Sequence, residues 1–292
     1  MLNSWLRAIR IRFLLASVIA VSNGLAIAYW KTGQIDPVNA LLTYVGVIFL
    51  HASVDLLNDY WDHKRGIDEM TTRTKFSGGT GVLPDKLLSP RAVYSAGIVF
   101  LILGGAIGAY FVVLKGFTIA VILGFAVVAI YFYSTSIVNA GLGELFVGIK
   151  GAMIVIGSYY VQSGQLDFAA SLAGIIVGLL SATVLFVNSF PDYAADKSGG
   201  RRTLVIMIGK NRAAKASPLF FVAAYCLVIA AVLTGHAKVY ALVSLASIPL
   251  SILACRELWR EWDNPNRIVK AMSRTVTYSR LTGSLLAISY LI

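Results

Sequence analysis

Asn58-Asp59-Tyr60-Trp61-Asp62 closes one long apolar run of this chain, and Asn188-Ser189-Phe190-Pro191-Asp192-Tyr193-Ala194-Ala195-Asp196 closes another. Each of these two acidic segments opens a polar, basic loop. Carboxylates at the edge of a membrane are costly unless they bind something, because the bilayer core cannot solvate charge. Two facing clusters of oxygen ligands suit Mg²⁺, which takes a few carboxylates and completes its octahedron with water and phosphate oxygens. The two segments therefore predict a magnesium site at one edge of a membrane protein.

The composition indicates an integral membrane protein. Hydrophobic residues make up 58% of the 292 residues, charged residues only 13%, and the mean hydropathy is +0.76. A membrane-spanning helix needs about 20 mostly apolar residues. Nine windows meet that need: 13–30, 37–58, 92–113, 117–135, 142–163, 168–188, 218–235, 239–254 and 275–292. We expect an all-α polytopic bundle of nine transmembrane helices that forms a single domain over residues 1–292.

The basic residues are distributed as in a membrane protein and not as in a nucleic-acid-binding one. The net charge is +11, but 21 of the 25 Lys and Arg residues fall in loops on one side of the expected bundle. Cytoplasmic loops carry such an excess in membrane proteins. We therefore expect a cell-membrane protein, with no nucleic-acid partner, whose two acidic segments lie at the cytoplasmic face. Some of these basic residues could also contact membrane lipid.

The two acidic segments share the spacing Asn-x-x-x-Asp, at Asn58/Asp62 and Asn188/Asp192, and they follow spans two and six. Residues four apart share one helix face, so Asp196 is expected to align with the second pair. Pro191 predicts a kink in that helix, because proline cannot donate a backbone hydrogen bond. An internal duplication would explain the repeat. The alternative to a metal site is that these acids are solvated helix ends paired with nearby Lys and Arg.

These motifs resemble the two aspartate-rich motifs of the UbiA superfamily of intramembrane prenyltransferases. Further similarity, closest to the menaquinone (MenA) branch, lies in Gly141–Gly148, Tyr159–Gly164 and Gly200–Leu204. The resemblance implies a nine-helix bundle around a central cavity that two cytoplasmic loops cap. It also implies Mg²⁺-dependent transfer of a prenyl chain from an allylic polyprenyl diphosphate, geranyl to geranylgeranyl or longer, to an aromatic acceptor through an allylic carbocation.

The resemblance also assigns site residues. The metal ligands would be Asn58, Asp62, Asp68, Asp192 and Asp196, with Asn188 as a helper at the diphosphate. Basic residues of the two loops are available for phosphate oxygens or for setting topology: Lys64, Arg73, Lys197, Arg201 and Arg202. Tyr133 matches a tyrosine of a family motif at the end of span four. Its ring, and that of Tyr131, could stabilise the cation, although tyrosine is also common at membrane interfaces.

The acceptor is the most open question. Hydroxybenzoate enzymes of the superfamily often carry Tyr-x-x-x-Lys where this chain has Tyr133 and Ile137. We therefore expect a naphthoate-type quinone precursor such as 1,4-dihydroxy-2-naphthoate. Ether-lipid synthesis of the digeranylgeranylglyceryl phosphate synthase type is the main alternative. A transporter is a remote one, since its charged residues would more naturally lie near the bilayer midplane.

Overall fold

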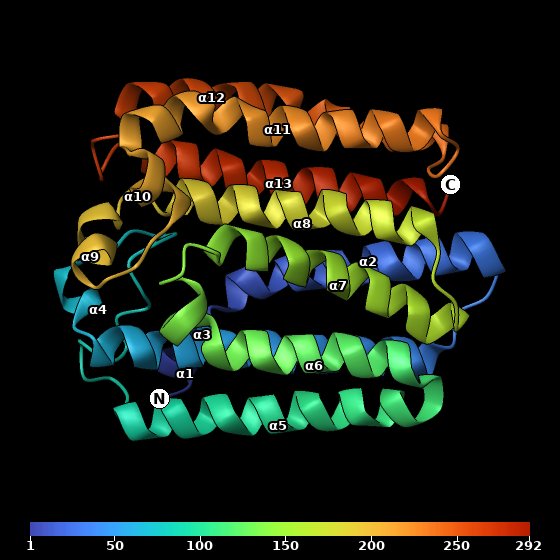
Figure 1. The fold of residues 1–292 in the computed structure, drawn as a ribbon, viewed down its shortest axis with the longest axis horizontal. Coiled ribbons are helices and arrows are strands. Elements are labelled where there is room, and N and C mark those ends of the chain that lie inside the picture. Colours follow the sequence, from blue (N-terminus) through green and yellow to red (C-terminus); the bar gives the residue numbers. More distant parts are fainter.

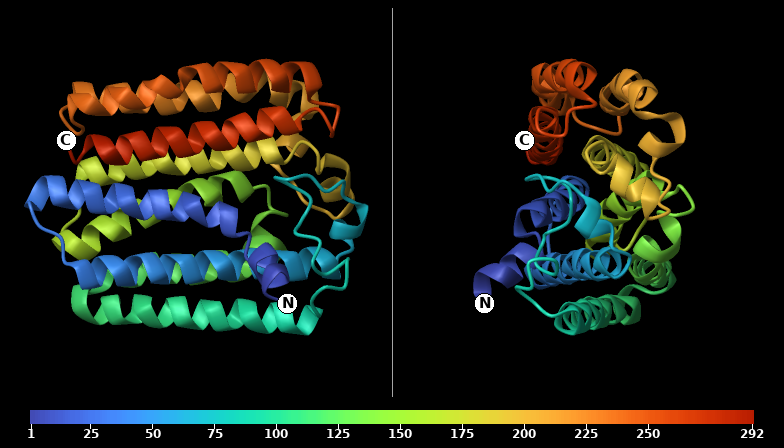
Figure 2. Two further views of the ribbon diagram at one scale, coloured as in Figure 1. Left: turned by 180° about the vertical axis from the view of Figure 1, so that it is seen from behind. Right: turned by 90° about the vertical axis from the view of Figure 1, so that its left-hand side faces the viewer.

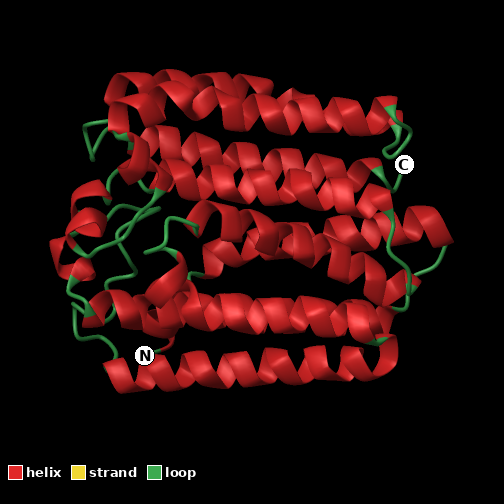
Figure 3. Cartoon of the chain, viewed as in Figure 1, coloured by secondary structure: helices red, strands yellow, loops and turns green.

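The computed structural model describes residues 1–292, and every regular element in it is helical (Figure 3). Long helices lie side by side along one common direction (Figure 1). They are α2 (Ile11–Thr32), α3 (Pro37–Lys64), α5 (Pro90–Lys115), α6 (Phe117–Phe132), α7 (Gly143–Ser163), α8 (Phe168–Asn188), α11 (Lys210–Leu233), α12 (Ile248–Glu261) and α13 (Val269–Ser289). A 3₁₀ helix, η2 (Val239–Ser247), leads directly into α12.

Eight of these helices, with η2 and α12 taken as one, are long and apolar enough to cross a membrane. The ninth, α13, has 21 residues like α8 but includes Lys270, Arg274 and Arg280, which lower its hydropathy. The two chain termini lie at opposite ends of the bundle (Figure 1), as an odd number of passes requires. The expected all-α membrane bundle is confirmed, and α13 is its most polar member.

Short turns connect the helices at one end of the bundle, which we call the far end. Asp36 caps α3 by accepting hydrogen bonds from the N–H groups of Val38 (2.9 Å) and Asn39 (3.0 Å), and Asp167 caps α8 through Ala169 N–H (2.7 Å). Such a cap is worth about 1 kcal/mol. Two of the few carboxylates in the chain therefore cap the starts of helices, far from the acidic segments.

The long loops fold together at the other end, which we call the loop end, with three short helices: α4 (Ile67–Met70), α9 (Tyr193–Ser198) and α10 (Leu204–Ile208) (Figures 1 and 2). The helix that was expected to kink at Pro191 instead ends: α8 stops at Asn188, Pro191 lies in a turn, and α9 begins at Tyr193. Proline has no N–H to continue the helix and clashes with the preceding turn. Asn188 and Asp196 therefore do not share one continuous helix face.

Helices α7 and α8 approach so closely that glycine is required at their contact. A Cβ atom on Gly178 would overlap the carbonyl oxygen of Gly148, and one on Gly151 would lie 2.8 Å from the Cα of Gly178. Small residues at helix contacts permit tight packing in membranes, where lipid tails are as apolar as the side chains and the hydrophobic effect contributes little. This glycine contact fixes α7 against α8.

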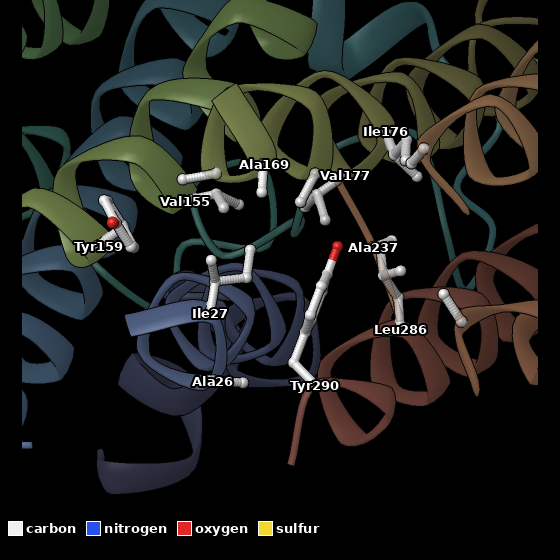
Figure 4. Close-up of a cluster of buried hydrophobic side chains, with 14 of the residues drawn as sticks. Ala26, Ile27, Val155, Tyr159, Ala169, Ile176, Val177, Ala237, Leu286 and Tyr290 are labelled. Carbon is white, nitrogen blue, oxygen red and sulfur yellow. The ribbon is translucent and has the colours of Figure 1, made fainter. Parts of the chain in front are cut away.

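The largest cluster of buried hydrophobic side chains lies toward the far end, where α2, α7, α8, α11, η2 and α13 meet (Figure 4). Ile27, Val155 and Leu286 are fully buried there, and the rings of Trp30 and Tyr290 lie 5.4 Å apart. Many of the remaining members are alanines, which let the helices come close. The main apolar core thus lies toward the far end, away from the loop end.

Candidate active site

A cavity of about 330 Å³ lies among α2, α3, α6, α7, α8 and α13. Its wall is largely apolar, with side chains such as Val54, Ile130 and Val147. At the loop end it turns polar, and the candidate ligands Asn58, Asp62, Asn188, Asp192 and Asp196 all line it. The central cavity implied by the family resemblance is therefore present, and the two acidic segments face each other across its mouth.

The first acidic segment lies on the last turns of the continuous helix α3. The Asn58 side-chain amide donates a hydrogen bond to Asp62 Oδ2 (2.9 Å), as the spacing of four residues allows, and Ser134 Oγ donates to Asn58 Oδ1 (2.8 Å). Ser134 belongs to η1 (Tyr133–Ile137), a π-helical turn that follows α6. Asp59 is held by Arg10 (2.6 Å) and by the hydroxyl of Thr80.

The second acidic segment is held by the loop that follows the first one. Thr71 Oγ1 donates a hydrogen bond to Asp192 Oδ1 (2.5 Å), and the backbone N–H of Gly78 donates to Asp192 Oδ2 (3.1 Å). The loop residues Phe76, Gly78 and Gly79 also line the cavity. The loop after α3 thus covers the cavity mouth and positions the carboxylate from the opposite side.

Arg201 joins the two acidic segments. Its guanidinium forms ion pairs with Asp62 and with Asp196 (3.0 Å), and it contacts Asn58 Oδ1 at 3.3 Å. Arginine suits this position because its planar fork can bind two carboxylates at once. The guanidinium places one positive charge between the oxygen groups that were expected to bind a metal.

Carboxyl groups outnumber basic side chains at the cavity mouth. Burial raises the pKa of Asp196 to about 7 despite the opposing effect of Arg201, with Asp192 and Asp62 adding to the rise. Burial, with repulsion from Asp62 and Asp59, raises the pKa of Asp68 to about 8. Burial also raises the pKa of Asp192. Each carboxyl would release its proton more easily if another cation were added, because a nearby positive charge favours the ionised form.

The residues present fit a divalent oxygen-binding cation. Asn188 Oδ1 is buried at the cavity wall and accepts no hydrogen bond. No three His, Cys, Asp or Glu side chains already converge on one point, so asparagine, water or phosphate oxygens would have to complete a coordination shell, as Mg²⁺ prefers. Asp68 does not line the cavity. It lies behind Gly79, where a Cβ atom would come within 2.5 Å of its Oδ1.

The other predicted site residues divide into two groups. Tyr133 and Arg201 line the cavity. The remaining aromatic and basic candidates do not: Tyr131 is 37% exposed, Lys64 lies over the Trp61 ring (4.9 Å), Arg73 pairs with Asp85 (2.7 Å), Lys197 lies over the Tyr193 ring (5.8 Å), and Arg202 is exposed. Among the five basic candidates, the structure brings Arg201 alone to the acidic segments.

The structure also brings to the cavity residues that were not among the predicted site residues, notably Arg10, Glu144, His51 and Lys150. Glu144 Oε1 accepts a hydrogen bond from the backbone N–H of Leu204 (2.9 Å) and so ties α7 to the first residue of α10. Charge inside an apolar span is costly and marks functional positions, which is the sequence signal that identifies Glu144 and Lys150. Arg10 gives no such signal, because it lies in an N-terminal cluster of arginines that also sets topology.

Comparison with known proteins places this fold and site in a family. The sequence profile of the UbiA prenyltransferase family matches residues 16–276, most of the chain and both acidic segments. The chain belongs to the UbiA prenyltransferase family. It is therefore a membrane-embedded prenyltransferase.

Two relatives of this UbiA-family chain are named 1,4-dihydroxy-2-naphthoate octaprenyltransferase. The protein from Bacillus subtilis is 29% identical over 288 residues, which cover 96% of this chain and 89% of the relative. The protein from Escherichia coli is 27% identical over 298 residues, with 97% and 93% covered. The similarity thus extends over nearly the full length of both relatives.

Solved structures share the UbiA fold. A UbiA homologue from Aeropyrum pernix K1 superposes with a TM-score of 0.73 at 19% identity, covering 95% of this chain and 98% of that one. A UbiA homologue from Archaeoglobus fulgidus bound to GPP and Mg²⁺ gives a TM-score of 0.67 at 17% identity, with 99% of each chain covered. These likenesses confirm the arrangement of the helices.

Proposed function

We propose that this prenyltransferase transfers a prenyl chain from an allylic polyprenyl diphosphate to an aromatic quinone precursor such as 1,4-dihydroxy-2-naphthoate. The observation that carries the proposal is one cavity with an acidic mouth and an apolar interior. Such a cavity suits a substrate with a charged head and a hydrocarbon tail. The relatives from Bacillus subtilis and Escherichia coli carry the name of this naphthoate activity, which supports the choice of acceptor.

The diphosphate head would lie at the cavity mouth, where Asn58, Asp62, Asp192 and Asp196 would hold Mg²⁺ with Asn188 and Asp68 in support. When bound, Mg²⁺ would act as a Lewis acid that offsets the charge developing on the departing diphosphate. Arg201 already lies between the two segments and supplies N–H donors for phosphate oxygens. Lys64, Arg73, Lys197 and Arg202 remain available at the outer surface of the loops for the approaching anion.

The allylic cation formed on ionisation needs an aromatic face and protection from water. Tyr133 lines the same cavity as the acidic segments and can stabilise a nearby cation through its ring. The apolar wall excludes water and so limits hydrolysis of the cation. Tyr131 lies at the exposed end of α6, two residues before Tyr133. From there it would help to position the Tyr133 ring.

The prenyl tail would extend into a second, apolar pocket of about 120 Å³ among α3, α5, α6 and α7. Val47, Leu50 and Ala126 line both this pocket and the main cavity, so the two volumes are adjacent. The pocket gives room beyond the reacting carbon for additional isoprene units. We propose chains from geranyl to geranylgeranyl or longer, bound within a single domain that comprises residues 1–292.

We further propose that the cavity mouth faces the cytoplasm in the cell membrane. The loops after α3 and α8 meet at the same end of the bundle (Figure 1), and they carry many of the basic residues. Cysteines introduced at Ser77 and Ser198 should both react with an impermeant thiol reagent only from the cytoplasmic side. Opposite reactivity of the two positions would reject the orientation and the site together.

Mass spectrometry of reaction products tests the proposed activity. Purified protein with Mg²⁺ and a prenyl diphosphate should convert 1,4-dihydroxy-2-naphthoate faster than 4-hydroxybenzoate or geranylgeranylglyceryl phosphate at equal concentration. A mostly apolar pocket rejects related shapes only weakly, so we expect a preference and some turnover of the other acceptors. Faster conversion of geranylgeranylglyceryl phosphate would instead establish an ether-lipid enzyme.

A further inference from the structure

A group of polar side chains lies deeper in the cavity than the acidic mouth and is not used by the diphosphate. Lys150, the eighth residue of α7, lines the main cavity and also the apolar side pocket. At 1.5 Å per residue it lies about 10 Å along α7 from the first residue of that helix. Its ammonium group forms no hydrogen bond and has no carboxylate within 4.0 Å.

Across the cavity, α3 presents His51 and Asp55 one turn apart. The distance from His51 Nε2 to Asp55 Oδ2 is 3.8 Å, too long for a hydrogen bond, and Asp55 Oδ2 is buried without any hydrogen-bond partner. His51 Nδ1 is held by Ser17 of α2 at 2.7 Å. Asp55 thus has a free acceptor oxygen, and Lys150 has free donors in the same interior part of the cavity.

Burial of such unpaired groups is expensive in a membrane protein, where a charge in a span normally pairs or marks a ligand pathway. Arg10 and Lys150 are the basic side chains that act on Asp55 electrostatically. Arg10 is already bound to Asp59 (2.6 Å), and no ion pair within 4.0 Å joins Lys150 to Asp55. A ligand that combines an anionic group with a hydroxyl donor would satisfy both side chains at once.

The diphosphate does not fit this position, because its own residues lie at the mouth. On α3, Asp55 lies one turn before Asn58, about 4.5 Å along the helix, and His51 lies about 10 Å before it. The second substrate is therefore the ligand to be accommodated. An aromatic acid with a hydroxyl group next to its carboxylate matches both free groups, since an ammonium binds carboxylate and a carboxylate accepts from a hydroxyl.

We propose that Lys150 binds the carboxylate of the aromatic acceptor and that Asp55 Oδ2 accepts a hydrogen bond from its neighbouring hydroxyl group. This inference rests on the proposed function and adds the residues that position the acceptor. The acceptor ring would then lie between this polar group and Tyr133, with its reacting edge directed toward the cavity mouth. Lys150 and Asp55 are positioning residues in this arrangement.

The main test compares two ligands that differ only in the carboxylate: 1-hydroxy-2-naphthoate and 1-naphthol. Equilibrium dialysis with the full-length protein in detergent needs no turnover. Lys150→Met should weaken binding of 1-hydroxy-2-naphthoate by about 10- to 100-fold, as expected for loss of a charged hydrogen bond, and should leave 1-naphthol within about twofold. Lys150→Arg should restore most of the affinity.

Two further variants complete the design. Asp55→Leu should weaken both ligands to a similar extent, because both carry the hydroxyl group. Lys115→Met, the same substitution at the far end of α5 and outside both cavities, should change neither. In steady-state assays Lys150→Met should raise KM for 1,4-dihydroxy-2-naphthoate without changing KM for the prenyl diphosphate.

Equal weakening of both ligands by Lys150→Met would show a structural role and overturn the inference, and so would unchanged binding of 1-hydroxy-2-naphthoate. The proposed function is tested separately with the wild-type protein. It would be rejected if the products contained no prenylated naphthoate. Thermal unfolding of each variant checks the fold, and Lys150→Met should be as stable as wild type because it removes an unpaired charge from the membrane interior.

Discussion

The two acidic segments have the same residue pattern but different supports. The first lies on the unbroken helix α3, where Asn58 and Asp62 bond to each other within one turn. The second follows the end of α8, and Asp192 is held by Thr71 and Gly78 of a distant loop. A repeat in sequence therefore does not produce a repeat in geometry. The first half of the site is set by a helix, and the second half depends on how the loop closes.

Removal of one carboxylate from either segment should have the largest effect. Asp62→Asn and Asp192→Asn should each lower kcat by about 10³-fold, because transition-state charge stabilisation of this kind is worth that much in other enzymes. Product formation measured by mass spectrometry at saturating Mg²⁺ checks the prediction.

Asp263→Asn is the matched control, since Asp263 is 72% exposed and pairs with Lys210 away from the cavity. Near-normal turnover by the Asp192 variant would show that the second segment is not part of the reaction site.

The second expected effect is a dependence of Mg²⁺ activation on pH. Asp196 and Asp68 have pKa values raised by burial to about 7 and about 8, so both are largely protonated at pH 6. Mg²⁺ must displace these protons. Its apparent affinity should therefore rise with pH from 6 to 8, by up to about tenfold per unit for each proton released.

Activation curves at pH 6, 7 and 8 measure this effect, and Asp68→Asn should flatten the part between pH 7 and 8. An unchanged slope in that variant would remove Asp68 from the metal environment. A higher apparent affinity for Mg²⁺ at pH 6 than at pH 8 would contradict the electrostatic argument as a whole.

A third variant breaks the support of the second segment alone. Thr71→Val preserves side-chain shape but removes the hydroxyl that donates to Asp192, leaving only the Gly78 N–H. We expect kcat/KM for the prenyl diphosphate to fall by about 10-fold, in line with loss of one hydrogen bond to a charged group. Steady-state kinetics with varied diphosphate checks this, and an effect confined to the acceptor KM would argue against it.

The corresponding change at the first segment should have the smallest effect. Ser134→Ala removes the donor to Asn58 Oδ1 (2.8 Å), but Asn58 remains bonded to Asp62 and in contact with Arg201. We expect a loss of about twofold in kcat/KM. A larger loss than that of Thr71→Val would reverse the proposed difference between a helix-supported half and a loop-supported half.

The sequence predicted the helices well because nine apolar windows of membrane length leave little choice of fold. It also predicted that Asp62, Asp192 and Asp196 would face one cavity, since carboxylates are rare in this chain and cluster at two places. It did not predict the end of α8 before Pro191. The missing N–H of proline can either kink a helix or end it, and the sequence does not distinguish the two outcomes. Nor could it separate Arg201 from Arg202, since the direction of neighbouring loop side chains is decided by tertiary contacts such as the pairing with Asp62.

The contact between Gly148 and Gly178 has a consequence for how accurately the two substrates can be brought together. Helix α7 carries Lys150, and α8 leads into Asn188 at the cavity mouth. Where these helices meet backbone to backbone, no side chain is available to change rotamer and absorb a displacement. The depth of the cavity interior relative to its mouth is consequently set by main-chain geometry at this contact.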